Sequence, residues 1–439
     1  MTRIKWKDRV EDMYLKIANE EDARVCKQIS DEACRSVPGN FFLIILSNTF
    51  TKLGDALSNP KTVLAWLMSY VSAPLYLIAF LVPIRESGSM LPQILIASYV
   101  RRLQLRKWVW VVGSILQFMA IASIGIVSIF FEGSAAGWMI LALLLLFSLS
   151  RGLCSVASKD VMGKTIPKTR RGRLNGYSTA ISGILVLAVG IFMLFRTDKE
   201  QDVMFYAYLL FGAAILWLIA AFTYSRIKEY PGETSGGGNA IREAFKRLDL
   251  LRTDIPFRRF VLARALLLCS ALTAPFYVVI AQDFLGKDIK ILGLFILASG
   301  ISASISGPFW GKLADSSSKT VMVRAAIITS LLGIFMFLVI TWIPVFRDSR
   351  WIYPLAFFIL GIAHSGVRLG RKTYIIDMAG GNRRTDYVAV SNTVIGVILL
   401  LTGGISALAS FISPEGIILI LSMFGLAGAI ASSKLPEVE

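Results

Sequence analysis

Long apolar runs constrain this chain more than any other feature of its sequence. Beyond residue 40 they recur at short intervals, each about 20 residues long, the length that a helix needs to cross the hydrocarbon core of a bilayer. The chain is also 55% hydrophobic, above the apolar share of ordinary soluble domains. We therefore predict an all-α polytopic membrane protein with about 12 transmembrane helices, because lipid accepts only helices and closed barrels.

The second half of the chain repeats the first. Segment 56–60 (ALSNP) matches 271–275 (ALTAP), the turn at 97–107 matches the turn at 307–322, and a double arginine at 170–171 matches another at 383–384. All three pairs keep the same order at an offset of about 213 to 215 residues. Two like halves in a membrane protein are typical of transporters, whose binding site lies between the halves.

Composition shifts divide the chain into five parts. We expect a cytosolic N-terminal tail (1–40), a six-helix bundle (41–224), a cytoplasmic linker with an amphipathic helix (225–257), a second six-helix bundle (258–433) and a cytosolic tail (434–439). The linker contains Pro-Gly at 231–232 and Ser-Gly-Gly-Gly at 235–238, which favour irregular structure. The first span (41–71) contains Asn59-Pro60 in its middle, so we expect a bent or broken helix there.

The net charge of +17 follows from the expected topology. Of the 46 Lys and Arg residues, 35 fall in segments predicted to face the cytoplasm and six in segments predicted to face outside. By the positive-inside rule this bias predicts a multi-pass protein of the inner membrane with both termini in the cytoplasm. The basic rims favour anionic membrane lipids. We expect no nucleic acid partner, because no basic module interleaved with aromatic residues is present.

One turn of the second half carries a recognisable motif. It reads Gly311-Lys312-Leu313-Ala314-Asp315 and is followed by Lys319. Together with the two six-span halves and the long basic linker, it resembles the major facilitator superfamily over residues 41–433. In the equivalent turn of the first half, Ala97 replaces the glycine and Arg101 replaces the aspartate.

The resemblance implies alternating access, in which two six-helix bundles rock about a central site. It also implies that the motif loop is a cytoplasmic latch, which makes Gly311, Asp315, Lys319 and Arg101 gating candidates. The family's first, fourth, seventh and tenth helices line the cavity. Most charged residues within the spans fall on those helices, and the site candidates are Lys52, Asp55, Arg151, Arg264 and His364, with Arg85 and Glu86 on the second span.

The two carboxylates each have two interpretations. A charge within the bilayer costs roughly 2.5–3.5 kcal/mol on insertion scales, so it normally faces protein or water and is a functional candidate. Asp55 is either a proton or substrate site, or the partner of Lys52 in a pair that stabilises the bend. Glu86 either forms an ion pair with another helix or titrates during coupling; adjacent Arg85 points about 100° away from it on the helix.

The remaining candidates are cationic or neutral. Arg151 and Arg264 lie toward the cytoplasmic third of their spans, where they either contact an anionic substrate or snorkel to the interface. His364 is either a proton carrier or a hydrogen-bonded packing residue. It is the single histidine of the chain and cannot by itself build a metal site, so we predict no metal and no cofactor. Arg368 is expected at the cytoplasmic rim.

These features predict a secondary active transporter for a small solute, coupled to protons, rather than an enzyme. No Gly-x-x-x-x-Gly-Lys-Ser/Thr loop is present, so the chain is not expected to be an ATP-driven pump. The excess of cationic residues in the cavity spans favours an anionic or amphipathic substrate. The alternatives are a multidrug exporter of lipophilic cations and a transporter-like sensor that moves nothing. We expect a monomer.

Overall fold

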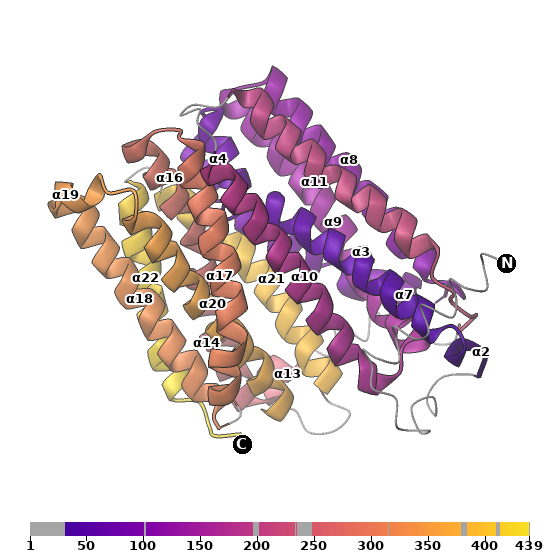
Figure 1. Ribbon diagram of the computed structural model, residues 1–439. Helices are drawn as coiled ribbons and strands as arrows, with labels where there is room; N and C mark the ends of the chain where they lie inside the picture. The colour runs from indigo at the N-terminus through magenta and orange to yellow at the C-terminus, as the bar shows by residue number, and fades with distance from the viewer. Residues whose placement is uncertain are drawn as a thin grey trace.

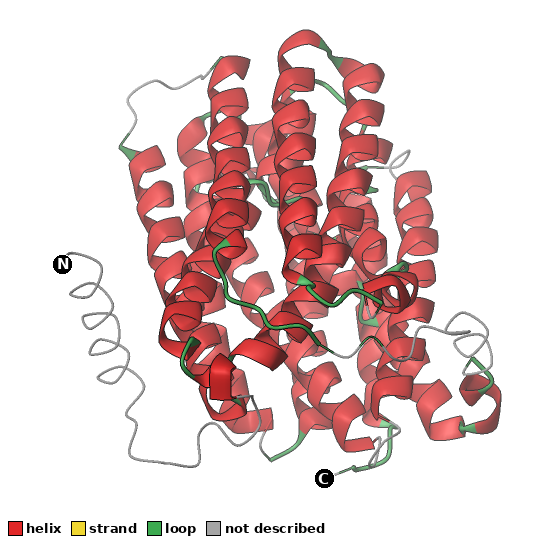
Figure 2. Ribbon diagram, turned by 90° about the vertical axis from the view of Figure 1, so that its right-hand side faces the viewer, coloured by secondary structure: helices red, strands yellow, loops and turns green. Residues whose placement is uncertain are grey.

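The computed structural model describes residues 31–100, 102–195, 202–232, 234, 248–314, 316–378, 384–409 and 413–438, and these residues form helices without strands (Figures 1 and 2). The predicted all-α class is therefore confirmed. The helices of the first half are α2 (Asp31–Cys34), α3 (Val37–Leu57), α4 (Val63–Tyr70), α5 (Leu75–Ile78), α6 (Leu81–Met90), α7 (Gln93–Val100), α8 (Lys107–Phe130), α9 (Gly133–Thr165), α10 (Lys168–Leu194) and α11 (Val203–Ser225).

The second half follows the same plan after a short helix that precedes its first span. Its helices are α13 (Leu250–Thr253), α14 (Ile255–Leu266), α15 (Cys269–Leu272), α16 (Ala274–Leu285), α17 (Ile289–Ala314), α18 (Ser318–Trp342), α19 (Pro344–Arg347), α20 (Ile352–Met378), α21 (Arg384–Ala409) and α22 (Pro414–Ser433). Among the described residues, nine helical stretches are long and apolar enough to cross a membrane.

The first two spans are built from broken helices. The predicted break in the first span is present, since α3 ends at Leu57 and α4 begins at Val63, with Asn59-Pro60 between them. Proline cannot donate a backbone hydrogen bond, and the side chain of Asn59 accepts one from the Lys61 amide at 2.9 Å. The second span consists of α5, α6 and α7, which are separated by turns before Leu81 and before Gln93. Asn59 and Lys61, which lie at the break in the first span, line a cavity.

Each half is a bundle in which helices distant in sequence pack together (Figure 1). In the first half α11 packs on α8 and α3, and in the second half α18 packs on α22 and α20. The halves contact each other mainly through α10 with α17 and α21 with α6. Small residues permit this close approach. A Cβ added at Gly190 would lie 2.7 Å from Leu297, and one at Gly403 would lie 2.6 Å from Pro83.

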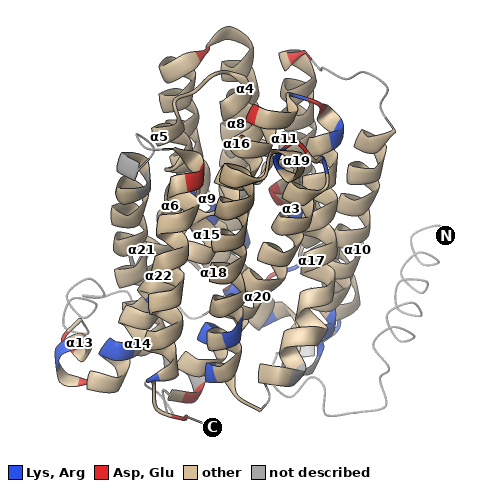
Figure 3. Ribbon diagram, turned by 90° about the vertical axis from the view of Figure 1, so that its left-hand side faces the viewer, with Lys and Arg blue, Asp and Glu red and all other residues tan. Residues whose placement is uncertain are grey.

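The segment that follows α11 is hydrogen-bonded to one end of the first half. The Glu229 carboxylate accepts hydrogen bonds from the Arg106 and Lys107 amides at 3.0 and 2.7 Å, at the positive N-terminus of α8. The Asn40 side chain exchanges two 2.9 Å bonds with the backbone of Lys228. We call this end, which also holds α13, the linker end, and the opposite end the far end. Lys and Arg gather at the linker end (Figure 3).

Several predicted features lie partly or wholly outside the described residues. They are most of the N-terminal tail, most of the predicted amphipathic linker helix, and the gating candidates Arg101 and Asp315. The double arginine at 170–171 belongs to the first turn of α10. The Arg171 guanidinium donates hydrogen bonds to the carbonyls of Gly163 and Ile166, at 2.8 and 3.0 Å, near the end of α9.

Candidate functional site

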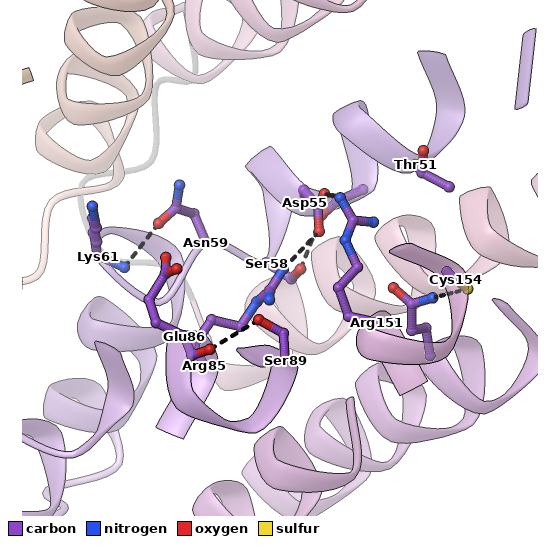
Figure 4. A network of polar contacts seen from close by, with 12 residues as sticks. Thr51, Asp55, Ser58, Asn59, Lys61, Arg85, Glu86, Ser89, Arg151 and Cys154 are labelled. Atoms are coloured by element: carbon purple, nitrogen blue, oxygen red, sulfur yellow. Dashed lines mark hydrogen bonds and ion pairs between the residues drawn. The ribbon is translucent and has the colours of Figure 1, made fainter. Parts of the chain in front are cut away.

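Asp55 is the centre of a three-residue ionic cluster next to the break in the first span (Figure 4). Its Oδ1 atom lies 3.2 Å from Nη2 of Arg85, and its Oδ2 atom pairs with Nη2 of Arg151. The guanidinium of Arg85 also lies over the ring of Phe147, 4.8 Å from its centroid. The three side chains are 15–28% exposed, so the cluster is shielded from bulk water on most sides. One carboxylate thus neutralises only one of two cations.

Lys52 does not take part in this cluster. Its ammonium donates to the hydroxyl oxygens of Ser178 and Thr179 on α10, at 2.9 and 2.5 Å. The alternative in which Lys52 pairs with Asp55 is therefore wrong. The spacing of three residues placed the two side chains on one helix face, but Arg85 and Arg151 from neighbouring helices reach the carboxylate instead.

A cavity of about 230 Å³ lies between the two halves and forms the second polar region. The first half contributes Lys61, which follows the break, and Glu86 of α6. Figure 4 shows Glu86 turned toward Asn59 and Lys61, whereas adjacent Arg85 is turned toward Asp55. The two neighbours therefore serve different clusters, as the angle between adjacent helical residues predicts. The second half contributes ionisable and hydroxyl side chains from α15 and α20.

His364 fixes the position of Lys61. The Lys61 ammonium lies 3.2 Å from Nε2 of His364, and Nδ1 of the same ring lies 3.1 Å from the hydroxyl of Ser270. An ammonium only donates, so Nε2 accepts and Nδ1 carries the hydrogen. Ser270 accepts that hydrogen and donates its own to the carbonyl of Leu267 at 3.0 Å. These hydrogen bonds run from Lys61 through His364 and Ser270 to the Leu267 carbonyl, and they join the two halves across the cavity.

Arg368 and Arg371 also line the cavity. Arg368 was expected at the cytoplasmic rim, and Arg371 was not predicted as a site residue. Both lie on α20 within two turns of His364, at a spacing that brings the three side chains to one helix face. That spacing could have identified the group from the sequence.

The other candidates lie away from the cavity. Arg264 is 7% exposed and donates to Ser391 and Asn392 of α21, at 2.6 and 2.9 Å, so it points into the second half instead of snorkelling. Lys319 pairs with Glu437 at 2.8 Å. A Cβ added at Gly311 would meet nothing within 4 Å. Among the described residues, no group of three or more His, Cys, Asp or Glu side chains could hold a metal ion.

Comparison with known proteins identifies the family. The sequence model of the Major Facilitator Superfamily matches residues 40–403, which is most of the chain. The chain belongs to the major facilitator superfamily. It is a multi-pass membrane protein and a secondary transporter rather than an enzyme. A comparison with curated proteins finds no significant match.

Solved structures of this superfamily share the fold at low sequence identity. A D-xylose-proton symporter matches with a TM-score of 0.69 and 14% identity, covering 91% of this chain and 99% of that one. A POT family transporter in complex with a thioalcohol-conjugated peptide matches with a TM-score of 0.68 and 11% identity, covering 89% and 94%. The nucleoside transporter NupG matches with a TM-score of 0.64 and 13% identity, covering 90% and 99%.

Proposed function

We propose that this major facilitator protein is a proton-coupled transporter that moves a small anionic solute by alternating access. The cavity carries this proposal. Lys61, Arg368 and Arg371 bring three cations to its wall, and Glu86 is the one acidic side chain among the lining residues described. A cleft lined mainly by one sign of charge concentrates counter-ions, and here those are anions.

Asp55 is the proposed coupling residue. Its carboxylate is shared by Arg85 and Arg151, which come from the second and fourth spans. Protonation would remove the shared anion and leave two guanidinium groups facing each other without a counter-ion. The helices that carry them then repel, so protonation at this position changes the relative stability of two helix arrangements. Glu86 lies in the solute cavity and is assigned a different role below.

In the proposed orientation the linker end and both termini face the cytoplasm. The protein is proposed to act as a monomer in the inner membrane. The halves meet at the far end, where Lys287 of the α16–α17 turn donates a hydrogen bond to the carbonyl of Tyr70 at 3.0 Å. The same ammonium lies over the Tyr70 ring, 4.4 Å from its centroid. Gln282 of α16 also donates to the carbonyl of Trp66 of α4 at 3.4 Å. These contacts support a state that is closed to the outside.

A flux assay in proteoliposomes tests this function. Purified protein is reconstituted, and uptake of anions, neutral sugars and lipophilic cations is followed with an acidic exterior. We expect one class of anions to accumulate, and we expect a protonophore to abolish that accumulation because it removes the driving gradient. Liposomes without protein are the control.

The other outcomes separate the alternatives. Anion flux that ignores the pH gradient would contradict proton coupling. Movement of lipophilic cations in place of anions would favour multidrug export. Saturable binding of an anion with no flux in either direction would indicate a sensor that does not transport.

A further inference from the structure

The cationic groups of the cavity come from both halves of the protein. Lys61 belongs to the first half, whereas Arg368 and Arg371 belong to α20 of the second. In the described part of the chain no ion pair engages Lys61, Arg368 or Arg371, in contrast to Arg85 and Arg151, which both contact Asp55. An empty cavity therefore holds like charges on two bodies that must approach each other during transport. A bound anion would remove this repulsion.

The charges of the cavity specify how many negative charges the solute carries. With His364 neutral, as its hydrogen bonds require, three cations face one carboxylate, Glu86. Counting each Lys and Arg as a cation and Glu86 as an anion, the cavity then carries a net formal charge of +2. Two negative charges on the solute neutralise the cavity, and a third would face Glu86 without a partner.

The size and remaining lining of the cavity fit a compact solute. Its volume of about 230 Å³ is below the range of drug-sized ligand sites. Hydroxyl groups of Ser299, Ser302 and Ser365 lie along the wall and suit the oxygens of a small polar molecule. Arginine binds carboxylate and phosphate oxygens with two parallel hydrogen bonds, a geometry that lysine does not offer.

We propose that the cavity selects small dianions, a class shared by short dicarboxylates and phosphomonoesters. Arg368 and Arg371 hold one end of the solute, Lys61 reaches the solute from the opposite half, and Glu86 excludes a third negative charge. His364 is a positioning residue that aims Lys61 through Nε2. This inference rests on the proposed transport function and names its substrate class.

Ligand binding to the purified full-length protein tests the class directly. A ligand that binds the folded state raises its melting temperature by mass action. The panel is succinate, glycerol 3-phosphate, butyrate, citrate and glycerol, which are small polar solutes with zero to three negative charges. We expect saturable stabilisation by succinate or glycerol 3-phosphate, with the dissociation constant about tenfold or more below that of butyrate. Whichever of the two binds more tightly shows whether the cavity prefers a dicarboxylate or a phosphomonoester.

Variants separate charge selection from folding. Glu86→Gln is expected to tighten dianion binding and to admit citrate, a gain that damage to the fold would not produce. Arg371→Gln is expected to reduce the preference for dianion over butyrate by about tenfold, whereas Arg258→Gln, at an exposed position of α14, makes the same charge change and leaves the preference unaltered. His364→Gln keeps an acceptor for Lys61 and is expected to retain more of this preference than His364→Leu.

Two outcomes would overturn the inference. One is equal stabilisation by succinate, butyrate and glycerol, and the other is an unchanged citrate response in Glu86→Gln. Flux measurements keep this result apart from the transport proposal. If another class of solute binds and moves, the dianion assignment fails while transport stands. If a dianion binds with the expected charge preference and never crosses the membrane, the transport proposal fails while the assignment stands.

Discussion

Asp55→Asn is expected to abolish proton-driven accumulation of the solute while exchange down its own gradient persists. Asparagine cannot gain or lose a proton, so the equilibrium between helix arrangements no longer responds to pH. The substitution also leaves Arg85 and Arg151 without their shared counter-ion. Removing one partner of a buried ion pair costs several kcal/mol, and the partial exposure of this cluster places the loss at about 3 kcal/mol.

Two further variants make the Asp55 prediction decisive. Asp55→Asn combined with Arg151→Gln removes one cation with the anion, so it is expected to recover most of the stability without restoring accumulation. Asp348→Asn makes the same chemical change at an exposed aspartate beside Arg347 and should behave like the wild type. Melting temperature and gradient-driven uptake are measured for each protein. Normal accumulation in Asp55→Asn would assign coupling to another residue.

Gly366→Ala is expected to lower both stability and solute affinity, because this glycine lets α20 approach a buried indole. A Cβ at this position would lie 2.6 and 2.8 Å from ring atoms of Trp310 and 2.9 Å from Ala325. Trp310 is held rigidly, since its Nε1 donates to the carbonyl of Ile362 at 2.8 Å and its side chain is fully buried. Overpacking of this kind costs about 1–3 kcal/mol.

The loss of affinity follows from the position of Gly366 on α20, between His364 and Arg368. A shift of the helix away from Trp310 moves both cavity residues. Gly212→Ala on α11 is the matched control, because nothing lies within 4 Å of its added Cβ, and it should keep or slightly raise the melting temperature. A melting temperature and dianion affinity equal to wild type in Gly366→Ala would contradict this account of the packing.

The membrane class, the helical fold and the superfamily could all be predicted from the sequence. Spans are a local property, because each needs only a run of apolar residues of sufficient length, and the repeat between halves is visible as an offset. The break at Asn59-Pro60 is equally local, because proline disrupts its own helix wherever the segment packs. The group of His364, Arg368 and Arg371 also had a local signal in its helical spacing, although only His364 was predicted as a site residue.

The partners of the charged residues were decided by tertiary packing. Asp55 lies closer in sequence to Lys52, yet it binds Arg85 and Arg151, which are 30 and 96 positions away. Lys61 and His364 are 303 positions apart and meet only because the two halves face each other. Arg264 is directed into the second half by Ser391, which belongs to another helix.

By itself, the sequence determined which segments enter the membrane and which charged residues enter with them. The tertiary structure decided which of those charges neutralise one another and which remain facing the cavity. The physical reason is that hydropathy sums over neighbouring residues, whereas an ion pair within a bundle depends on the rotation and contact of helices that are distant in sequence.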